Sequence, residues 1–324
     1  MTPDPSGPPE RIGRRCWRIP LPDPFAPGVT SAFLLELDGG TRWLLDAGAD
    51  TEASAEKLRA GLRRLAAPSP AEPAGVILSH SHLDHAGGLL RWRPPLLAAH
   101  ERCVAEMRNR EAASSRGAEA LRRMGVPEAE LASLLPPRDD APAASLAEIP
   151  VDLALRGDRG PLPAGGDWSW ILAEGHAPGH LMMFEPVDRV LLVGDQFLVR
   201  WKTPYRITDP DEDAFGLHLA SLDAAIGLEP EVICSSHTDA VRPAVPWLEE
   251  RKASLLRQVE RTREAAAAGG VSAWDVVAGR PGGQVSGGLR VLLLREQLAI
   301  LRHLAAGGAL ERGSDGTVER FGPA

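Results

Sequence analysis

The residues from 79 to 88, SHSHLDHAGG, hold the densest group of metal-binding side chains in the chain. Three of the nine histidines, His80, His82 and His85, lie there together with Asp84. Imidazole and carboxylate groups are the usual protein ligands of Zn²⁺. In an extended chain His80, His82 and Asp84 would share one side, and the glycines that follow allow a turn that returns His85 to it. A single histidine is most often structural, but four ligand-type residues after an apolar strand predict a metal site.

Three later motifs carry the same residue types. EGHAPGH contains His176, LLVGDQ contains Asp195, and ICSSHTD contains His237. Each of these residues comes at or just after the end of an apolar run that reads as a strand, and α/β sheets carry their sites at the carboxyl ends of strands. Each residue alone has a structural reading, as a turn or loop residue. Together with the first motif they indicate a single site.

The combination HSHLDH, GHAPGH, GD and a late strand-ending histidine resembles the metallo-β-lactamase superfamily, over about residues 15–245. The resemblance implies an α/β fold, an αββα sandwich. It implies a first metal ion held by His80, His82 and His176, a second held by Asp84, His85 and His237, and Asp195 bridging both. Asp46 would lie behind the ligands and fix the tautomer of a histidine. Ala-Glu-Gly-His at 173–176 and Ser-Ser-His-Thr at 235–238 depart from the usual family motifs without removing a ligand.

Such a site would make the protein a binuclear zinc-dependent hydrolase. Two Zn²⁺ ions would share a bridging hydroxide as the nucleophile, and Asp84 would act as a catalytic residue that orients it or carries its proton. Iron or manganese are alternative metals. The expected substrate is a small acyl compound, a thioester, lactone or ester, either free or on an acyl carrier. The alternatives are a phosphodiesterase or endoribonuclease with the same site, and a regulator that only holds metal.

Apolar runs predict strands at 31–37, 42–48, 74–79, 168–172, 180–186, 189–195 and 231–237. Helical periodicity predicts helices at 51–67, with Thr51 as its cap, within 100–136, at 209–228 and at 244–268. The 100–136 segment contains Leu121, Met124, Leu131, Leu134 and Leu135. These side chains could form a lid over an acyl chain or pack against the sheet. Strands that alternate with helices favour an α/β sandwich.

The tail has its own pattern: a short helix at 270–279, then a long amphipathic helix and a hairpin within 287–321. This order predicts a winged-helix-like domain. We therefore divide the chain into a flexible N-terminus (1–14), the metallo-β-lactamase fold domain (15–245) and the tail (246–324). Arg290, Arg295 and Arg302 could contact nucleic acid, but acids alternate with bases along the tail and packing or dimerisation is favoured.

The composition narrows the partners. The 324 residues carry a net charge of −8, are 44% hydrophobic and include three scattered cysteines. This acidity gives no general attraction to nucleic acid or an anionic membrane, and the cysteines fit a reducing compartment. The first residues lack a signal-peptide core. We expect a cytoplasmic protein with a small-molecule or acyl-carrier substrate, no membrane partner, and nucleic acid or a homodimer left as alternatives.

Overall fold

Two β-sheets form the centre of the computed structural model, which describes residues 3–25, 28–66, 72–109, 117–135, 144–163, 165–279 and 287–324. The first sheet runs in chain order: β1 (Glu10–Gly13), β2 (Cys16–Pro22), β3 (Val29–Glu36), β4 (Arg42–Leu45), β5 (Gly75–Ile77), β6 (Leu97–His100) and β7 (Leu153–Leu155). The second has the order β12 (Val232–Ser235), β11 (Val190–Gly194), β10 (Leu181–Glu185), β9 (Ser169–Leu172) and β8 (Arg159–Pro161). A separate hairpin joins β13 (Leu310–Asp315) to β14 (Val318–Pro323).

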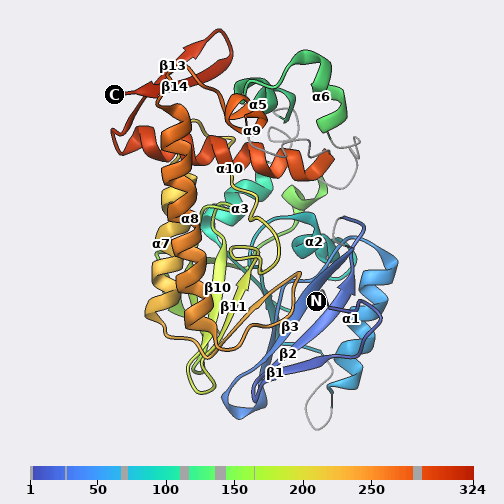
Figure 1. Cartoon of the computed structure of the whole chain (residues 1–324). Coiled ribbons are helices and arrows are strands. Elements are labelled where there is room, and N and C mark those ends of the chain that lie inside the picture. Colours follow the sequence, from blue (N-terminus) through green and yellow to red (C-terminus); the bar gives the residue numbers. More distant parts are fainter. Residues whose placement is uncertain are drawn as a thin grey trace.

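Helices cover the outer faces of both sheets (Figure 1). The α-helices of the described residues are α1 (Glu52–Arg64), α2 (Leu83–Ala86), α3 (Glu101–Arg108), α5 (Gly117–Arg123), α6 (Glu128–Leu134), α7 (Ala214–Gly227), α8 (Ala244–Ala266), α9 (Ala273–Ala278) and α10 (Gly287–Ala306). Short 3₁₀ helices are η1 (Asp38–Gly40), η2 (Gly87–Leu90) and η3 (Ala144–Glu148). Thr51 caps α1 as expected, since its hydroxyl accepts a hydrogen bond from the Ser54 amide.

Three hydrophobic cores establish the order of the layers. Phe33 and Leu35 of β3 face a core shared with the second sheet, whereas Ala32 and Leu34 face a core shared with α1 and α3. In β11, Leu192 faces the core between the sheets, and its two neighbours face α7, α8 and α10. Side chains alternate along a strand, so continuous apolar runs belong to sheets that are covered on both faces. The αββα sandwich expected from the resemblance is therefore present.

The sequence missed strands that break the usual composition rules. β1 lies in the segment expected to be flexible, and the Arg14 side chain that follows it bonds Asp188 with 2.6 Å between Nε and Oδ1. β2 contains Pro20, which lacks a backbone donor. The strand tolerates Pro20 because β1 pairs with β2 only as far as Arg18, so no neighbour on that side needs the missing N–H.

The tail packs on the same core as the second sheet. Leu298 and Phe321 belong to one cluster with Leu191 and Phe215, and the predicted boundary at 245 falls inside the first turn of α8. In Figure 1, α10 crosses above the ends of β10 and β11. The expected order of two helices and a hairpin is present as α9, α10 and β13–β14. The division into domains and the winged-helix assignment stay predictions.

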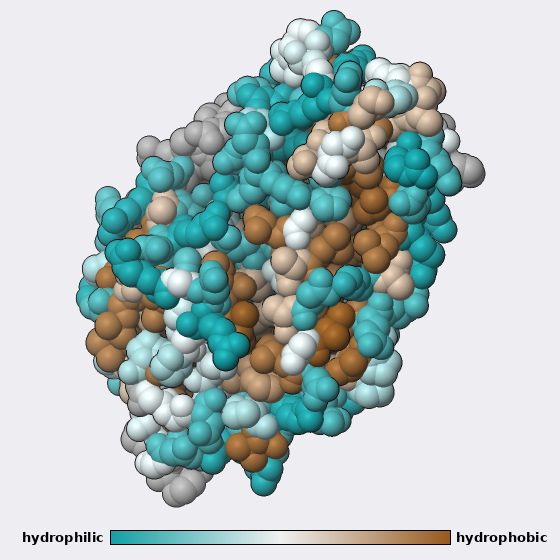
Figure 2. Space-filling view, turned by 90° about the vertical axis from the view of Figure 1, so that its left-hand side faces the viewer, coloured by the Kyte–Doolittle hydropathy of each residue, from teal (hydrophilic) through white to brown (hydrophobic). Residues whose placement is uncertain are grey.

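Hydrophilic and hydrophobic residues both occur on the surface of the protein. On the face in Figure 2, hydrophilic residues dominate the rim and hydrophobic ones gather nearer the middle. Exposed large hydrophobic residues of the described chain include Phe25, Leu96, Val187, Leu256 and Leu289, at distant positions in the sequence. Scattered apolar residues are normal on a protein surface. Among the described residues no helix combines the length and hydrophobicity that a membrane crossing needs.

Candidate metal centre

The seven predicted ligands converge on one place, as two groups. Each group has its ligand atoms within 4.8 Å of one another. His80, His82, His176 and Asp195 form the first group, and Asp84, His85, Asp195 and His237 form the second group. Four strands deliver them, because the ligands follow the carboxyl ends of β5, β9, β11 and β12. Asp195 belongs to both groups, so the two would hold neighbouring ions.

The first group points three imidazole nitrogens at one another. His82 Nδ1 lies 3.0 Å from His80 Nε2 and 3.0 Å from His176 Nε2, and the two Nε2 atoms are 3.3 Å apart. A tetrahedral Zn²⁺ with bonds of about 2.0–2.1 Å would separate its ligand nitrogens by about 3.3 Å. Lone pairs facing each other at this distance repel unless a cation or proton lies between them. The spacing therefore fits a metal ion.

The second group mixes imidazoles with carboxylates. Asp84 Oδ2 lies 3.3 Å from His85 Nε2 and 3.2 Å from His237 Nε2. Asp195 Oδ1 lies 3.4 Å from His85 Nε2, and its Oδ2 lies 3.1 Å from His237 Nε2. His85 Nε2 and Asp195 Oδ1 are buried without a hydrogen-bond partner. Unpaired buried polar atoms are costly, and a metal ion would satisfy both.

Asp84 lies in the second group with His85 and His237, as the resemblance implies. Strict alternation would place its carboxylate with His80 and His82, but α2 begins at Leu83 with His82 at its N-cap. Asp84 is already in a helix, so it turns with the neighbouring His85 toward the second group. The glycines do not open a longer helix here, since α2 ends at Ala86 and η2 follows.

Asp46 and Ser79 fix the tautomers of two histidines. Asp46 Oδ2 accepts from His85 Nδ1 at 2.8 Å and from the Ser79 hydroxyl at 2.7 Å. Because the Ser79 hydroxyl donates to Asp46, it accepts from His80 Nδ1, 2.9 Å away. Both histidines therefore present an unprotonated Nε2 to the site when neutral. The sequence predicted this role for Asp46 but not for Ser79.

Two backbone carbonyls do the same for His176 and His237. His176 Nδ1 donates to Pro204 O at 2.9 Å, and His237 Nδ1 donates to Val29 O at 2.7 Å. Carbonyl oxygens only accept, so each Nε2 is the nitrogen left for a ligand bond. No side-chain type marks these contacts in the sequence, because any residue carries a carbonyl.

His180 and Gln196 hold the residues next to the ligands. The Asp195 amide donates to His180 Nε2 at 3.2 Å, so His180 supports Asp195 and is not in either group. Gln196 Nε2 donates to Glu174 O at 2.6 Å, which ties the end of β11 to the turn that carries His176.

The two groups differ in charge. Burial lowers the pKa of His176 to about 4, and burial with neighbouring imidazoles lowers the pKa of His80 well below its ordinary value. Burial also opposes the charged form of His237, but Asp195 and Asp84 outweigh it and raise its pKa to about 10. The same carboxylates raise the pKa of His85. Without an ion, burial favours neutral imidazoles at His80 and His176, whereas the carboxylates favour protonated imidazoles at His85 and His237.

The sequence missed Asp23, which lies in the loop between β2 and β3. Its side chain is buried and Oδ2 has no hydrogen-bond partner, while Oδ1 accepts from the Phe25 amide at 3.1 Å. Burial raises the pKa of Asp23 to about 6, and the charge of Asp84 acts in the same direction. A carboxyl with this pKa exchanges protons near neutral pH. A lone aspartate among loop prolines gave no signal of this.

Most of the side chains that could have formed a lid are buried. Leu121, Met124, Leu131 and Leu134 pack into the core under α10, which favours packing over a lid. Tyr205 is also buried, with its ring 5.0 Å from that of His218. Tyr205 and His218 both pack in the interior of the protein.

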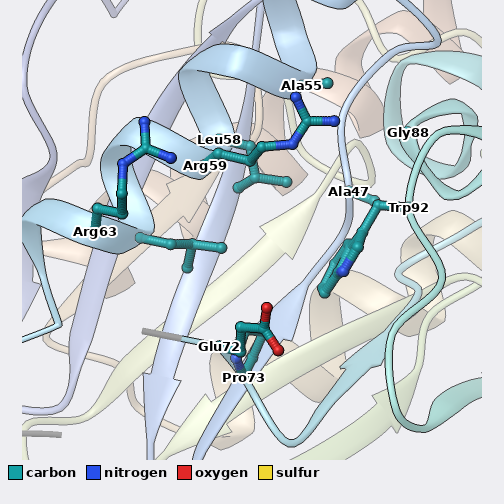
Figure 3. A pocket seen from close by; sticks show the side chains of 10 residues that line it. Ala47, Ala55, Leu58, Arg59, Arg63, Glu72, Pro73, Gly88 and Trp92 are labelled. Carbon is teal, nitrogen blue, oxygen red and sulfur yellow. The ribbon is translucent and has the colours of Figure 1, made fainter. Parts of the chain in front are cut away.

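A separate pocket lies under α1 (Figure 3). Its volume is about 360 Å³, and Leu58, Leu62 and Trp92 line it, with Arg59 and Arg63 among its charged residues. Its described lining includes none of the seven ligands. The pocket is therefore distinct from the two groups.

Comparison with known proteins agrees with this geometry. The sequence profile of the Metallo-beta-lactamase superfamily matches residues 26–237, which contain all seven predicted ligands. The probable metallo-hydrolase YybB of Bacillus subtilis is 24% identical over 211 residues, or 63% of this chain and 79% of that protein.

Two crystal structures share the fold over nearly the whole chain. A metallo-beta-lactamase family protein of Thermus thermophilus has a TM-score of 0.75 at 22% identity, covering 97% of this chain and 100% of that one. A beta-lactamase domain protein of Burkholderia ambifaria has a TM-score of 0.71 at 21% identity, covering 100% and 97%. Their coverage extends the shared fold into the tail. With the profile matching most of its length, the chain belongs to the metallo-beta-lactamase superfamily.

Proposed function

We propose that this protein is a binuclear zinc-dependent hydrolase that acts on a small acyl substrate, a thioester, lactone or ester. The observation that carries the proposal is the sharing of Asp195 by two groups of ligand atoms, each within 4.8 Å. Two bound zinc ions would lower the pKa of a shared water toward about 7, which supplies hydroxide at neutral pH, and would polarise the carbonyl oxygen of the substrate. The name of the Bacillus relative, a probable metallo-hydrolase, supports the reaction class.

The chain's own residues prepare the site for this chemistry. Asp46, Pro204 O and Val29 O orient three histidines through their Nδ1 atoms. The Asp84 carboxylate lies 3.3 Å from His85 Nε2 and 3.2 Å from His237 Nε2. From there it can bind a metal ion and can also orient a nucleophile or hold its proton. Buried surroundings exclude bulk water and strengthen each of these interactions.

The phosphodiesterase or endoribonuclease alternative has less support from the tail. Arg290 bonds Glu130 at 3.3 Å, Arg295 bonds Tyr205 O at 2.8 Å, and Arg302 bonds Glu319 at 2.6 Å. The arginines that could have contacted nucleic acid are therefore engaged within the protein. A nucleic-acid partner would bind with a steep dependence on salt. The acyl proposal expects no such binding.

A substrate screen with metal analysis tests the proposal. Purified protein loaded with zinc would be analysed for metal content and assayed with acyl thioesters, lactones and bis-p-nitrophenyl phosphate. We expect two ions per chain and acyl hydrolysis that a chelator abolishes and added zinc restores. Faster phosphodiester cleavage than cleavage of every acyl substrate would favour the alternative. A chain that binds no divalent ion would overturn both.

A further inference from the structure

The segment from Lys202 to Asp209 lies between the tail and the turn that carries His176. On one side, Pro204 O accepts from His176 Nδ1 at 2.9 Å. The Arg206 amide also donates to Gly175 O at 2.9 Å. Two consecutive peptide groups of this segment therefore contact the metal-centre turn directly.

On the other side, α10 holds the same segment. Arg295 Nε donates to Tyr205 O at 2.8 Å, and Arg302 Nη1 donates to Ile207 O and Asp209 O, each at 3.0 Å. Glu296, which is buried, pairs with Lys202 at 2.6 Å. Arg295 and Arg302 are seven residues apart, so they lie on one face of the helix. Figure 1 shows α10 crossing above the strands that carry the site.

One peptide group joins the two sides. The carbonyl of Tyr205 accepts from Arg295, and the amide that shares its plane, that of Arg206, donates to Gly175 O. The next carbonyl toward the N-terminus is Pro204 O, the acceptor for His176. Peptide groups are planar, so fixing the Tyr205 carbonyl also fixes the direction of the Arg206 amide. The Pro204 carbonyl is separated from this plane only by Tyr205, so its direction is restricted too.

We propose that Arg295 of the C-terminal helix is a positioning residue for the first group: by holding the Tyr205–Arg206 peptide, it keeps Pro204 O in place to orient His176. This inference rests on the proposed function in one respect, that the first group holds a metal ion. The tail then belongs to the metal centre and is not a separate binding module.

The chemistry of the contact supports a specific role. A guanidinium donates a stronger hydrogen bond than a neutral group does. Contacts behind metal ligands commonly change metal affinity by about 10–100-fold when removed.

The test compares two arginines of α10. Arg295→Met removes the donor, Arg295→Lys retains a cation, and Arg290→Met is the matched control, since Arg290 contacts Glu130 and stacks on Trp274 at 4.8 Å. Each variant is made with His237→Ala, which leaves the first group, and with His176→Ala, which leaves the second. Zinc affinity is measured by competition with a chromophoric chelator.

We expect Arg295→Met to weaken zinc binding by about tenfold in the His237→Ala protein and to leave it unchanged in the His176→Ala protein. Arg295→Lys should recover part of the loss, and Arg290→Met should change neither affinity. Equal weakening in both proteins, or an unchanged affinity in the first, would overturn the positioning role.

A metal-independent measurement separates this inference from the proposed function. Long-range ¹H–¹⁵N NMR spectra of the metal-free single variants, assigned with His176→Gln, report which ring nitrogen of His176 carries the proton. We expect the Nδ1–H tautomer in the unaltered protein and in Arg290→Met, and a mixture in Arg295→Met. If the protein binds no zinc but this difference appears, the proposed function fails and the positioning role stands. If zinc binds and the tautomer is the same in all three, the positioning role fails alone.

Discussion

The two ligand groups share Asp195 but shift the pKa values of their histidines in opposite directions. The first group collects three imidazoles; burial lowers the pKa of His80 and His176, and neighbouring imidazoles lower that of His80 further. The second group places the carboxylates of Asp84 and Asp195 beside two imidazoles, and their attraction raises the pKa of His85 and His237. The same residue type is therefore neutral in one half of the site and protonated in the other.

This difference implies that the two groups differ in how many protons they must release to bind a metal ion. In the first group burial favours the neutral imidazoles of His80 and His176, so an ion meets two ligands that are already deprotonated. In the second group protons occupy the positions that an ion would take, and metal binding must displace them. A centre built this way would load its two sites with unequal dependence on solution conditions.

Replacing the shared ligand should have the largest effect. Asp195→Ala removes an oxygen from both groups and leaves the protonated imidazoles of the second group without one of their two carboxylates. We expect loss of both ions and a fall in turnover beyond the ~100-fold typical of changes behind the ligands. Metal content by mass spectrometry and the acyl assay check this. Two retained ions with ordinary turnover would show that Asp195 bridges nothing.

Replacing one histidine from each group separates the halves. His176→Ala should leave one ion per chain, held by the second group, and His237→Ala should leave one ion, held by the first. His303→Gln is a suitable control because His303 bonds Asp213 at 2.8 Å and belongs to neither group. Stoichiometry by mass spectrometry should give one, one and two ions. Loss of both ions in either single variant would contradict independent groups.

The comparison also shows what the sequence could predict. The family motifs identified all seven residues of the two groups, because metal-donor atoms must be side chains of a few types at fixed places relative to strands. The apolar runs predicted β3, β4, β5 and the strands β9 to β12. Alternation failed at Asp84, because a strand period cannot be extended through the residue where α2 begins.

The contacts that orient the ligands were harder to foresee. Val29 O and Pro204 O act through the backbone, which has no residue-type signature. Asp23 comes close to the second group only through the fold, since β3 and β4 carry the chain back between them. The sequence favours packing or dimerisation for the arginines of α10, but the partners of Arg295 and Arg302 are carbonyls in a loop about 90 residues earlier, a pairing that depends on tertiary packing.

The sharpest test of the comparison is the pH dependence of metal affinity. The pKa of His237 is raised to about 10, so this imidazole is protonated at pH 7 and must release its proton to bind through Nε2. Affinity of the second group should therefore rise by about tenfold per pH unit for each displaced proton. The pKa of His176 is lowered to about 4, so above pH 5 this imidazole has no such proton to release.

The two slopes can be measured on the single variants just described. Zinc competition at pH 6, 7 and 8, corrected for the chelator's own protonation, gives the second group in His176→Ala and the first in His237→Ala. We expect a clear slope in the former and a nearly flat line in the latter. Equal slopes would mean that the carboxylates of the second group do not hold protons on its histidines. The electrostatic contrast between the halves would then have no consequence for loading, whereas unequal slopes would make falling pH a way to empty one half of the centre before the other.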